Sequence, residues 1–286
     1  MKNLSVIVPA RNESDGLRLL LPQLLEILPN AEIVVVNDGS DDDTRAVCAG
    51  FPVVVINNPY CKGNGAAVKS GVRAARGEVL LFMDADGQHQ PKDIPALLEK
   101  LEQGYDMVVG ARGKGSQAGI HRAFANGFYN RLASWMVGQR IDDLTSGFRV
   151  ARANKFRKYL YMLPNGFSYP TTITMCFFRA GLSVGYVPIH APKRVGNSHM
   201  RIMRDGVRFL LIIFKIGTLY SPLKLFFPIS VSFFTMGCGY YIYTFVTQNR
   251  FTNMSTVLFI TSILVFLMGL ISEQITQLVY KDQDRP

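Results

Sequence analysis

Two carboxylates, those of Asp84 and Asp86, follow the short apolar stretch Val79–Met83 in the first third of the chain. An apolar run bounded by turn-forming residues is typical of a buried parallel strand, and ligands bind at the carboxyl ends of such strands. Gly87 and Pro91 end the strand and let both carboxylates converge. Oxygen ligands of this kind suit Mg²⁺ or Mn²⁺, ions that usually bind together with a diphosphate. Taken alone, the stretch is equally compatible with a strand followed by an acidic turn.

The elements that would position these carboxylates alternate at short intervals along the first part of the chain. Apolar runs predict strands over residues 4–8, 32–36, 53–56 and 79–83. Leucines at helical spacing predict a helix over 17–28. Cap-type residues at 41–44 predict the start of a second helix, and a third helix is predicted to end near residue 75. This alternation predicts a doubly wound, mostly parallel α/β sheet with right-handed crossovers.

Polar or glycine residues follow each of the predicted strands: Arg11–Glu13, Asp38, Gly63 and Gly65, and Asp84–Gln88. Because a nucleotide lies across several strand ends in sheets of this kind, we expect these residues to line one site. Two other nucleotide-binding classes are disfavoured. Pro9–Glu13 stands where a dinucleotide-binding fold requires the G-x-G-x-x-G fingerprint, and the Lys62–Gly65 turn lacks the P-loop spacing.

Five segments occur in an order and at spacings that are typical of one family: Val8–Glu13, Val35–Thr44, Lys62–Ala67, Asp84–His89 and Asp143–Arg149. Together they resemble the family 2 glycosyltransferases with the GT-A fold. More narrowly, they are similar to the polyprenyl-phosphate glycosyltransferases, which include the dolichyl-phosphate mannose synthases. The resemblance covers nearly the whole chain. Arg11 stands where the family often has an aromatic residue and Asn37 where it often has Asp, and both positions lie where the nucleobase is read.

The resemblance implies roles for individual residues. Asp86 and Gln88 would be ligands of Mg²⁺ or Mn²⁺, with Asp84 close to the metal, the sugar or the ribose. Residues expected to bind the nucleotide-sugar are Pro9, Arg11, Glu13, Asp38, Lys62, Asp84, Arg194 and Ser198, of which the last two match the R-x-G-x-S position. Arg112 and Arg122 would hold a lipid phosphate, with Ser146 also on the acceptor side. The catalytic residues implied are Asp86, Arg112 and Arg122, and the implied transfer inverts the anomeric centre.

The acceptor decides between two subclasses of transferase. A sugar hydroxyl loses a proton during attack and usually needs a carboxylate base. A phosphate monoester has a second pKa of about 6, so it is already largely ionised and needs positive charge instead. Asp142 and Asp143 precede the Thr145–Arg149 loop and are candidates for a base, although we expect them to order the loop. His89 and the other three histidines lack metal-ligand spacing, and we expect them to be polar loop residues.

Two long stretches without charged residues lie in the last quarter of the chain, Leu225–Asn249 and Phe251–Ser272. A membrane-spanning helix needs about 20 apolar residues, so these predict transmembrane helices at 225–247 and 254–275. The basic residues of the preceding segment share one helical face and predict an interfacial helix on anionic headgroups: Arg201, Arg204, Arg208 and Lys215. They supply part of the formal net charge of +10.

We therefore expect a GT-A catalytic domain over residues 1–199, a juxtamembrane amphipathic region over 200–222, a transmembrane hairpin over 223–280 and a cytoplasmic tail over 281–286. Basic residues before the first span outnumber the single Arg250 between the spans, which places the catalytic domain on the cytoplasmic face. We expect no cleavable signal peptide. The four cysteines show no paired spacing, which fits a reducing compartment.

The predicted function is transfer of a single hexose-type sugar from a UDP- or GDP-sugar to a polyprenyl phosphate, such as undecaprenyl or dolichyl phosphate. One alternative is a metal-dependent transferase that acts on a hydroxyl group of a lipid or glycan. The other is a membrane protein that binds a nucleotide-sugar without turnover. The expected partners are the nucleotide-sugar, the polyprenyl phosphate and the bilayer, with no nucleic acid. Assembly into a homo-oligomer is compatible with this interpretation.

Overall fold

The computed structural model describes residues 3–113, 120–166, 168–190, 217–218 and 220–281, without the side chains of residues 120–126 and 279–281. The chain divides into two compact units, one within residues 1–200 and the other within residues 201–286. The expected juxtamembrane helix, with Arg201, Arg204, Arg208 and Lys215, falls almost entirely outside the described residues, as do Arg194 and Ser198.

The first unit is built on a seven-stranded sheet with strand order β3-β2-β1-β4-β6-β5-β7. Its strands are β1 (Leu4–Ala10), β2 (Glu32–Asp38), β3 (Val54–Asn58), β4 (Val79–Phe82), β5 (Met107–Arg112), β6 (Arg149–Arg152) and β7 (Val184–Ile189). Neighbouring strands are parallel except at β6, which runs antiparallel to both β4 and β5. The predicted doubly wound, mostly parallel sheet is confirmed.

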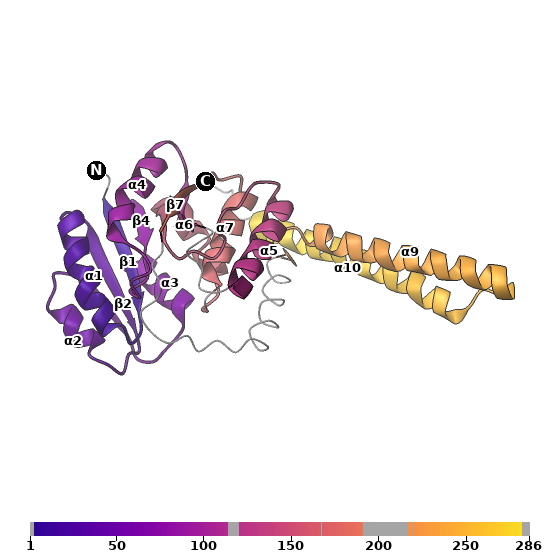
Figure 1. Ribbon diagram of the computed structural model, residues 1–286, viewed down its shortest axis with the longest axis horizontal. Helices are drawn as coiled ribbons and strands as arrows, with labels where there is room; N and C mark the ends of the chain where they lie inside the picture. The colour runs from indigo at the N-terminus through magenta and orange to yellow at the C-terminus, as the bar shows by residue number, and fades with distance from the viewer. Residues whose placement is uncertain (1–2, 114–119, 167, 191–216, 219, 282–286) are drawn as a thin grey trace. The chain divides into compact units, whose positions relative to one another are not determined.

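Helices cover both faces of this sheet (Figure 1). They are α1 (Ser14–Ile27), α2 (Thr44–Ala49), α3 (Asn64–Ala74), η1 (Pro91–Asp93), α4 (Ile94–Glu102), α5 (Ile120–Val137), α6 (Ala153–Lys158), η2 (Leu160–Met162) and α7 (Tyr169–Arg179). Figure 1 shows α1 and α3 on opposite sides of β1 and β2.

Alternation along the strands explains the two layers of core. On β1, Val6 and Val8 join one buried cluster with Leu17, Leu21 and Leu24 of α1. On β2, Val34 and Val36 face the other way and pack with Ala67 of α3. Full burial of a leucine contributes about 2 kcal/mol, so the leucine face of α1 is a main fastening of this layer.

The antiparallel strand β6 was not foreseen. The sequence interpretation placed Thr145–Arg149 in a loop, but Arg149 begins β6 and pairs with Phe82 of β4 and Val109 of β5. Because β4 ends at Phe82, this register brings the segment before β6 beside Asp84. The approach is close, since a Cβ on Gly147 would lie 2.8 Å from Oδ2 of Asp84 and would displace that carboxylate.

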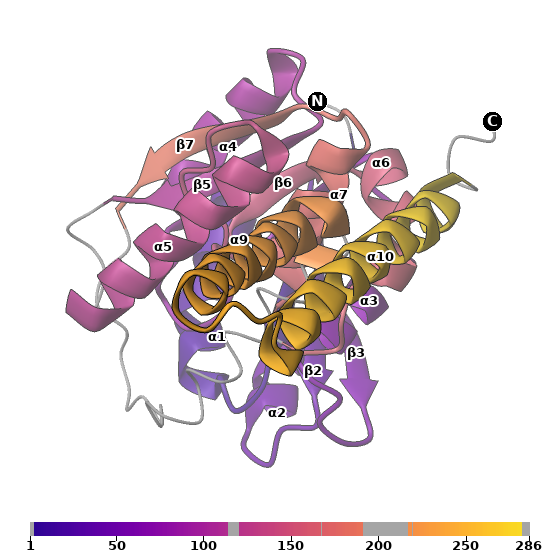
Figure 2. The ribbon, with the colours of Figure 1, turned by 90° about the vertical axis from the view of Figure 1, so that its right-hand side faces the viewer.

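The second unit is a helical hairpin of α9 (Pro222–Gln248) and α10 (Asn253–Lys281), which lie side by side (Figure 2). Each helix runs somewhat beyond the spans predicted at 225–247 and 254–275. Both are long and apolar enough to cross a membrane. Large apolar side chains on both helices are exposed, including Phe234, Ile242 and Ile263, as expected for surfaces that face lipid.

Small residues at intervals of seven form the seam of the hairpin. They are Ser230, Gly237 and Thr244 on α9, and Ser255, Ser262, Gly269 and Thr276 on α10. Two reciprocal hydrogen bonds cross the seam, because each hydroxyl of Ser230 and Ser262 donates to the other residue's carbonyl at 2.9 Å. Small residues let two helices approach closely where no water drives them together, so this seam holds the hairpin by packing and hydrogen bonding.

Candidate active site

A cavity of about 330 Å³ lies at the carboxyl ends of β1, β2 and β4. Five residues that the sequence predicted to bind the nucleotide-sugar line it together with the predicted metal ligand Asp86: Pro9, Arg11, Glu13, Asp38 and Asp84. The fold therefore brings residues from three separate motifs to one place, which we call the donor cavity. Lys62 and Gln88 are not among its lining residues, and the Lys62 ammonium instead lies 5.7 Å from the ring centroid of Tyr60.

Asp38 accepts four hydrogen bonds at the wall of the donor cavity. Its Oδ1 accepts hydrogen bonds from Asn58 Nδ2 and Lys62 N, and its Oδ2 from Gly63 N and Cys61 Sγ. Burial by itself would raise the pKa of Asp38, but these four donors outweigh it and the pKa lies below the usual value. A carboxylate has about four acceptor positions, and the four donors to Asp38 use this number. Asp38 therefore anchors the cavity wall. Direct contact between Asp38 and a nucleoside stays a prediction.

Four backbone amides of the Lys62–Ala66 turn are already used in hydrogen bonds within the protein. The amides of Lys62 and Gly63 donate to Asp38, while those of Gly65 and Ala66 donate to the carbonyls of Gly166 and Asn165. Gly65 is required here, because a Cβ would lie 2.0 Å from the Pro164 carbonyl oxygen. The amides of Gly65 and Ala66 thus fix the amino end of α3 to the 164–166 loop and are not available to a ligand.

Asp84 and Asp86 present carboxylate oxygens to the same cavity. Oδ1 of Asp86 accepts a hydrogen bond from the Gln88 amide at 3.1 Å, which turns the chain sharply after β4. Two carboxylates beside a space for phosphates fit Mg²⁺ or Mn²⁺, ions that commonly take one or two carboxylates and complete their shell with water and substrate oxygens. Within the described ranges no three His, Cys, Asp or Glu side chains are grouped to hold a metal ion, so the site depends on such additional ligands.

His89 lies in the loop between β4 and η1, as predicted, but it is not a solvated residue. Its side chain is buried, its ring stacks on Phe148 with centroids 5.0 Å apart, and its Nδ1 accepts a hydrogen bond from the Asp84 amide at 3.0 Å. Burial lowers the pKa of His89 to about 4. The imidazole is therefore neutral at pH 7 with its proton on Nε2, and the 3.9 Å approach of Nδ1 to the Asp84 carboxylate is not an ion pair.

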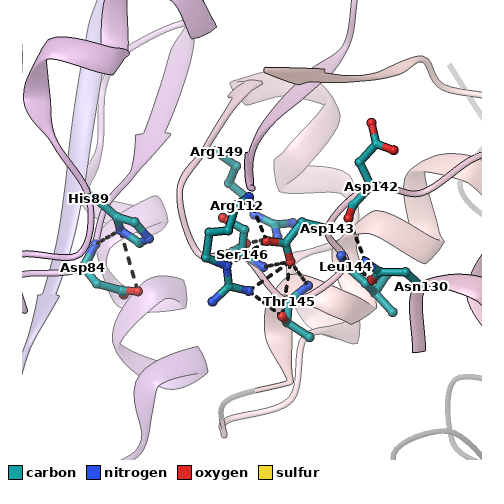
Figure 3. Close-up of polar contacts among 10 residues, drawn as sticks. All are labelled: Asp84, His89, Arg112, Asn130, Asp142, Asp143, Leu144, Thr145, Ser146 and Arg149. Carbon is teal, nitrogen blue, oxygen red and sulfur yellow. Dashed lines mark hydrogen bonds and ion pairs between the residues drawn. The ribbon is translucent and has the colours of Figure 1, made fainter. Parts of the chain in front are cut away.

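Arg112 and Asp143 form the centre of a second cluster (Figure 3). Nε and Nη2 of Arg112 donate to the two carboxylate oxygens of Asp143 at 2.7 and 3.0 Å, and Nη2 also donates to Thr145 Oγ1 at 2.7 Å. Among the described residues Nη1 of Arg112 has no hydrogen-bond partner, and the side chain keeps 23% of its surface exposed. A guanidinium held in this way presents one edge to an incoming anion.

Asp143 is unsuited to act as a base. Besides Arg112, its carboxylate accepts hydrogen bonds from the amides of Thr145 and Ser146. Burial would raise the pKa of Asp143, but Arg112 and these amides hold it below its usual value. Asp142 pairs instead with Arg140 at 2.7 Å, and its carboxylate points away from Asp143 (Figure 3). The expectation that these residues order the loop is confirmed for Asp143.

Two further residues of this segment are fully buried. Ser146, predicted on the acceptor side, has a buried hydroxyl without a hydrogen-bond partner among the described residues. Arg149 was not predicted as a site residue, although an arginine directly before the apolar Val150–Ala151 pair is an unusual strand residue and could have signalled it. Arg122 lies on α5, and its side chain is outside the described residues.

The comparison with known proteins follows from this geometry. The sequence profile of glycosyl transferase family 2 matches residues 5–161, which contain the donor cavity and the Arg112–Asp143 cluster. The chain belongs to glycosyl transferase family 2. A second profile, the GtrB C-terminal hairpin, matches residues 221–278, which form α9 and most of α10. Each of the two units of this family 2 transferase therefore contains a segment that matches a known sequence profile.

Curated relatives share sequence over much of the chain. It is 34% identical to the undecaprenyl-phosphate mannosyltransferase of Micrococcus luteus, over 68% of this chain and 86% of that protein. It is 30% identical to the polyprenol monophosphomannose synthase of Mycolicibacterium smegmatis, over 68% of this chain and 80% of that protein. A third relative is the undecaprenyl-phosphate 4-deoxy-4-formamido-L-arabinose transferase of Klebsiella pneumoniae, which is 30% identical and of whose length the chain spans 64%.

Solved structures support the fold. Glucosyl-3-phosphoglycerate synthase from Mycobacterium tuberculosis, crystallised with Mn²⁺, uridine diphosphate and glucosyl-3-phosphoglycerate, matches with a TM-score of 0.61 at 18% identity. The match covers 76% of this chain and 79% of that one. At this identity the likeness establishes the GT-A-like fold alone.

Proposed function

We propose that this family 2 enzyme transfers one sugar from a nucleotide diphosphate sugar to a polyprenyl phosphate, with inversion, while its hairpin anchors it in the membrane. The observation that carries the acceptor class is Arg112. Asp143 holds this guanidinium in place, Nη1 has no partner within the described part of the chain, and the same contact removes Asp143 as a base. An acceptor that needs positive charge and no base fits this cluster better than a hydroxyl group does.

The donor side follows from the donor cavity. Pro9, Arg11 and Glu13 would contact the nucleotide, and Asp38 would fix the cavity wall against it. Asp84 and Asp86 would hold Mg²⁺ or Mn²⁺, with Gln88 as a further ligand. When bound, the ion neutralises the charge that develops on the leaving diphosphate. Arg194 and Ser198 are proposed to contact the same diphosphate.

The relatives indicate which substrates to try. The names of three of them specify undecaprenyl phosphate or polyprenol as acceptor, and mannose or 4-deoxy-4-formamido-L-arabinose as the sugar. We therefore propose a hexose-type or related sugar carried on UDP or GDP. Arg11 and Asn37, which depart from the family pattern, are the residues to examine for the choice of base.

The catalytic unit is proposed to lie on the cytoplasmic face. Lys193, Arg194 and the predicted interfacial residues precede the hairpin, whereas Arg250 alone lies between α9 and α10. A single cysteine introduced at Asn249, in a variant whose four native cysteines are replaced, should react with an impermeant maleimide from the outside of intact cells. Labelling only after permeabilisation would place the turn on the inside and overturn this orientation.

The decisive experiment uses the full chain in nanodiscs that contain undecaprenyl or dolichyl phosphate. Radiolabelled UDP- and GDP-sugars are added with and without Mn²⁺, and transfer into an acid-labile lipid is measured. Asp86→Asn should abolish the transfer, whereas Asp15→Asn, which changes an exposed residue of α1 paired with Arg18, should leave it unchanged. Label that appears solely in a hydroxyl-linked product would refute the proposed acceptor.

A further inference from the structure

Arg149 is a charged residue sealed inside the first unit. Its relative exposure is 0%, and among the described residues no Asp or Glu forms an ion pair with it. Nη1 donates to the Pro170 carbonyl at 2.9 Å and to Thr174 Oγ1 at 3.1 Å, Nη2 donates to the Ser146 carbonyl, and Nε has no hydrogen-bond partner in the described part of the chain. Figure 3 shows it beside Ser146, behind the Arg112–Asp143 cluster.

A guanidinium in this position keeps its charge. Burial lowers the pKa of Arg149, but an arginine stays protonated in proteins at neutral pH. Burying an ion without a counter-ion is costly, so the position of Arg149 calls for a reason other than packing. The core around Arg149 contains Phe82, Phe148 and Tyr169, so a methionine or leucine would suit the surroundings better if packing were the sole requirement.

The charge is directed at the segment that Asp143 orders. Asp143 holds the amides of Thr145 and Ser146 from one side, and Arg149 holds the carbonyl of Ser146 from the other. Arg112 and Arg149 therefore flank this segment with two positive charges, while Asp143 supplies one negative charge between them. The Asp84 carboxylate, which approaches Gly147, adds a second negative charge, so without Arg149 the segment beside Arg112 would carry a net negative charge.

We propose that Arg149 is a positioning residue for the phosphate acceptor: it fixes the Ser146 carbonyl from behind and supplies buried positive charge that favours a dianionic phosphate at Arg112. This inference rests on the proposed function. Because the interior around Arg149 contains little water, its field reaches the acceptor side with less screening than that of a surface arginine. The donor cavity is lined by other residues, so nucleotide binding should not depend on Arg149.

The test compares Arg149→Met and Arg149→Lys with Arg152→Met in the full chain. Arg152 is a matched control, because it lies on the same strand and its guanidinium also donates to backbone carbonyls, those of Tyr105 and Leu101. We expect Arg149→Met to raise the KM for undecaprenyl phosphate by about tenfold or more, the effect of losing one charge-assisted hydrogen bond. Arg149→Lys keeps the charge and should raise it less, and Arg152→Met should leave it unchanged. The Kd for the nucleoside diphosphate with Mn²⁺ should stay within about twofold for all three.

Each outcome decides the matter. An unchanged acceptor KM in Arg149→Met, or a loss of nucleotide affinity in parallel with acceptor affinity, overturns the positioning role. Equal defects in the Met and Lys variants overturn the part played by charge. If Arg149→Met does not fold, Arg149→Lys decides, since a normal acceptor KM there would contradict the fixing of Ser146. A wild-type protein without transfer to lipid phosphate would instead refute the proposed function itself.

Discussion

His89 stacks on Phe148 with ring planes 16° apart, and this contact joins the segment after β4 to the segment before β6. The first segment carries Asp84 and Asp86, and the second carries Ser146 and Gly147. A carboxylate oxygen of Asp84 also lies against the backbone of Gly147. The proposed donor and acceptor halves of the site are therefore built on one packed unit.

Phe148→Leu tests that unit. Leucine keeps most of the buried apolar surface but removes the stacked ring, so we expect a loss of stability of about 1 kcal/mol. Transfer activity should fall by more than this loss of stability explains, because Asp84 and Ser146 lose their common support. Thermal unfolding and initial rates of the full chain measure the two effects. Equal activity in the variant would show that the stack is structural only.

His89 should make the folded protein sensitive to mild acid. Its folded pKa of about 4 lies below the ordinary value of 6.5, so the unfolded chain binds the proton more tightly between these values. Stability is then fully present above pH 6.5 and decreases as the pH falls toward 4, by about 3 kcal/mol in total. His89→Gln, measured with EDTA present, should lose this dependence. A decrease of the same size in the variant would assign it to other groups.

Asp143→Asn should lower both the stability of the fold and the transfer to a phosphate acceptor at Arg112. The substitution leaves Arg112 largely buried without its carboxylate, which we expect to destabilise the fold by about 2–4 kcal/mol and to reduce transfer strongly. Asp142→Asn is the control, because the Asp142–Arg140 pair is exposed and such pairs contribute less than about 1 kcal/mol. Equal behaviour of the two variants in denaturation and transfer assays would contradict the assignment.

The seam of the hairpin can be tested with two glycines of α9. A Cβ on Gly237 would lie 3.0 Å from the Phe259 ring, whereas one on Gly239 would meet nothing within 4 Å. Gly237→Ile should therefore separate the helices and lower the thermal stability of the protein in nanodiscs, and Gly239→Ile should be tolerated because it faces open space. If both variants unfold at the wild-type temperature, α9 and α10 do not meet along this seam.

The sequence was most informative where one element is enough to define a position. Asp84 and Asp86 follow an apolar strand, and strand ends of a parallel sheet share one edge, so their meeting with Arg11 and Asp38 could be predicted. The small residues of the hairpin were not noticed because their role depends on a partner helix. The burial of His89 depends on Phe148, and that of Arg149 depends on α7. In each case the partner is distant in the chain. Likewise, the four donors to Asp38 become visible only when the Asn58–Gly63 segment folds back onto β2.

The backbone amides already used beside the donor cavity affect how the protein distinguishes a nucleoside diphosphate from a monophosphate. The amides of Lys62 and Gly63, just before α3, donate to Asp38, and those of Gly65 and Ala66 donate to the 164–166 loop. At the start of α1 the amides of Glu13 and Ser14 donate to Thr44 and Asp42. These six amides are therefore not available to the second phosphate of a donor. Recognition of a diphosphate over a monophosphate would then depend on the divalent ion, and chelation should make the protein bind the two nucleotides almost equally.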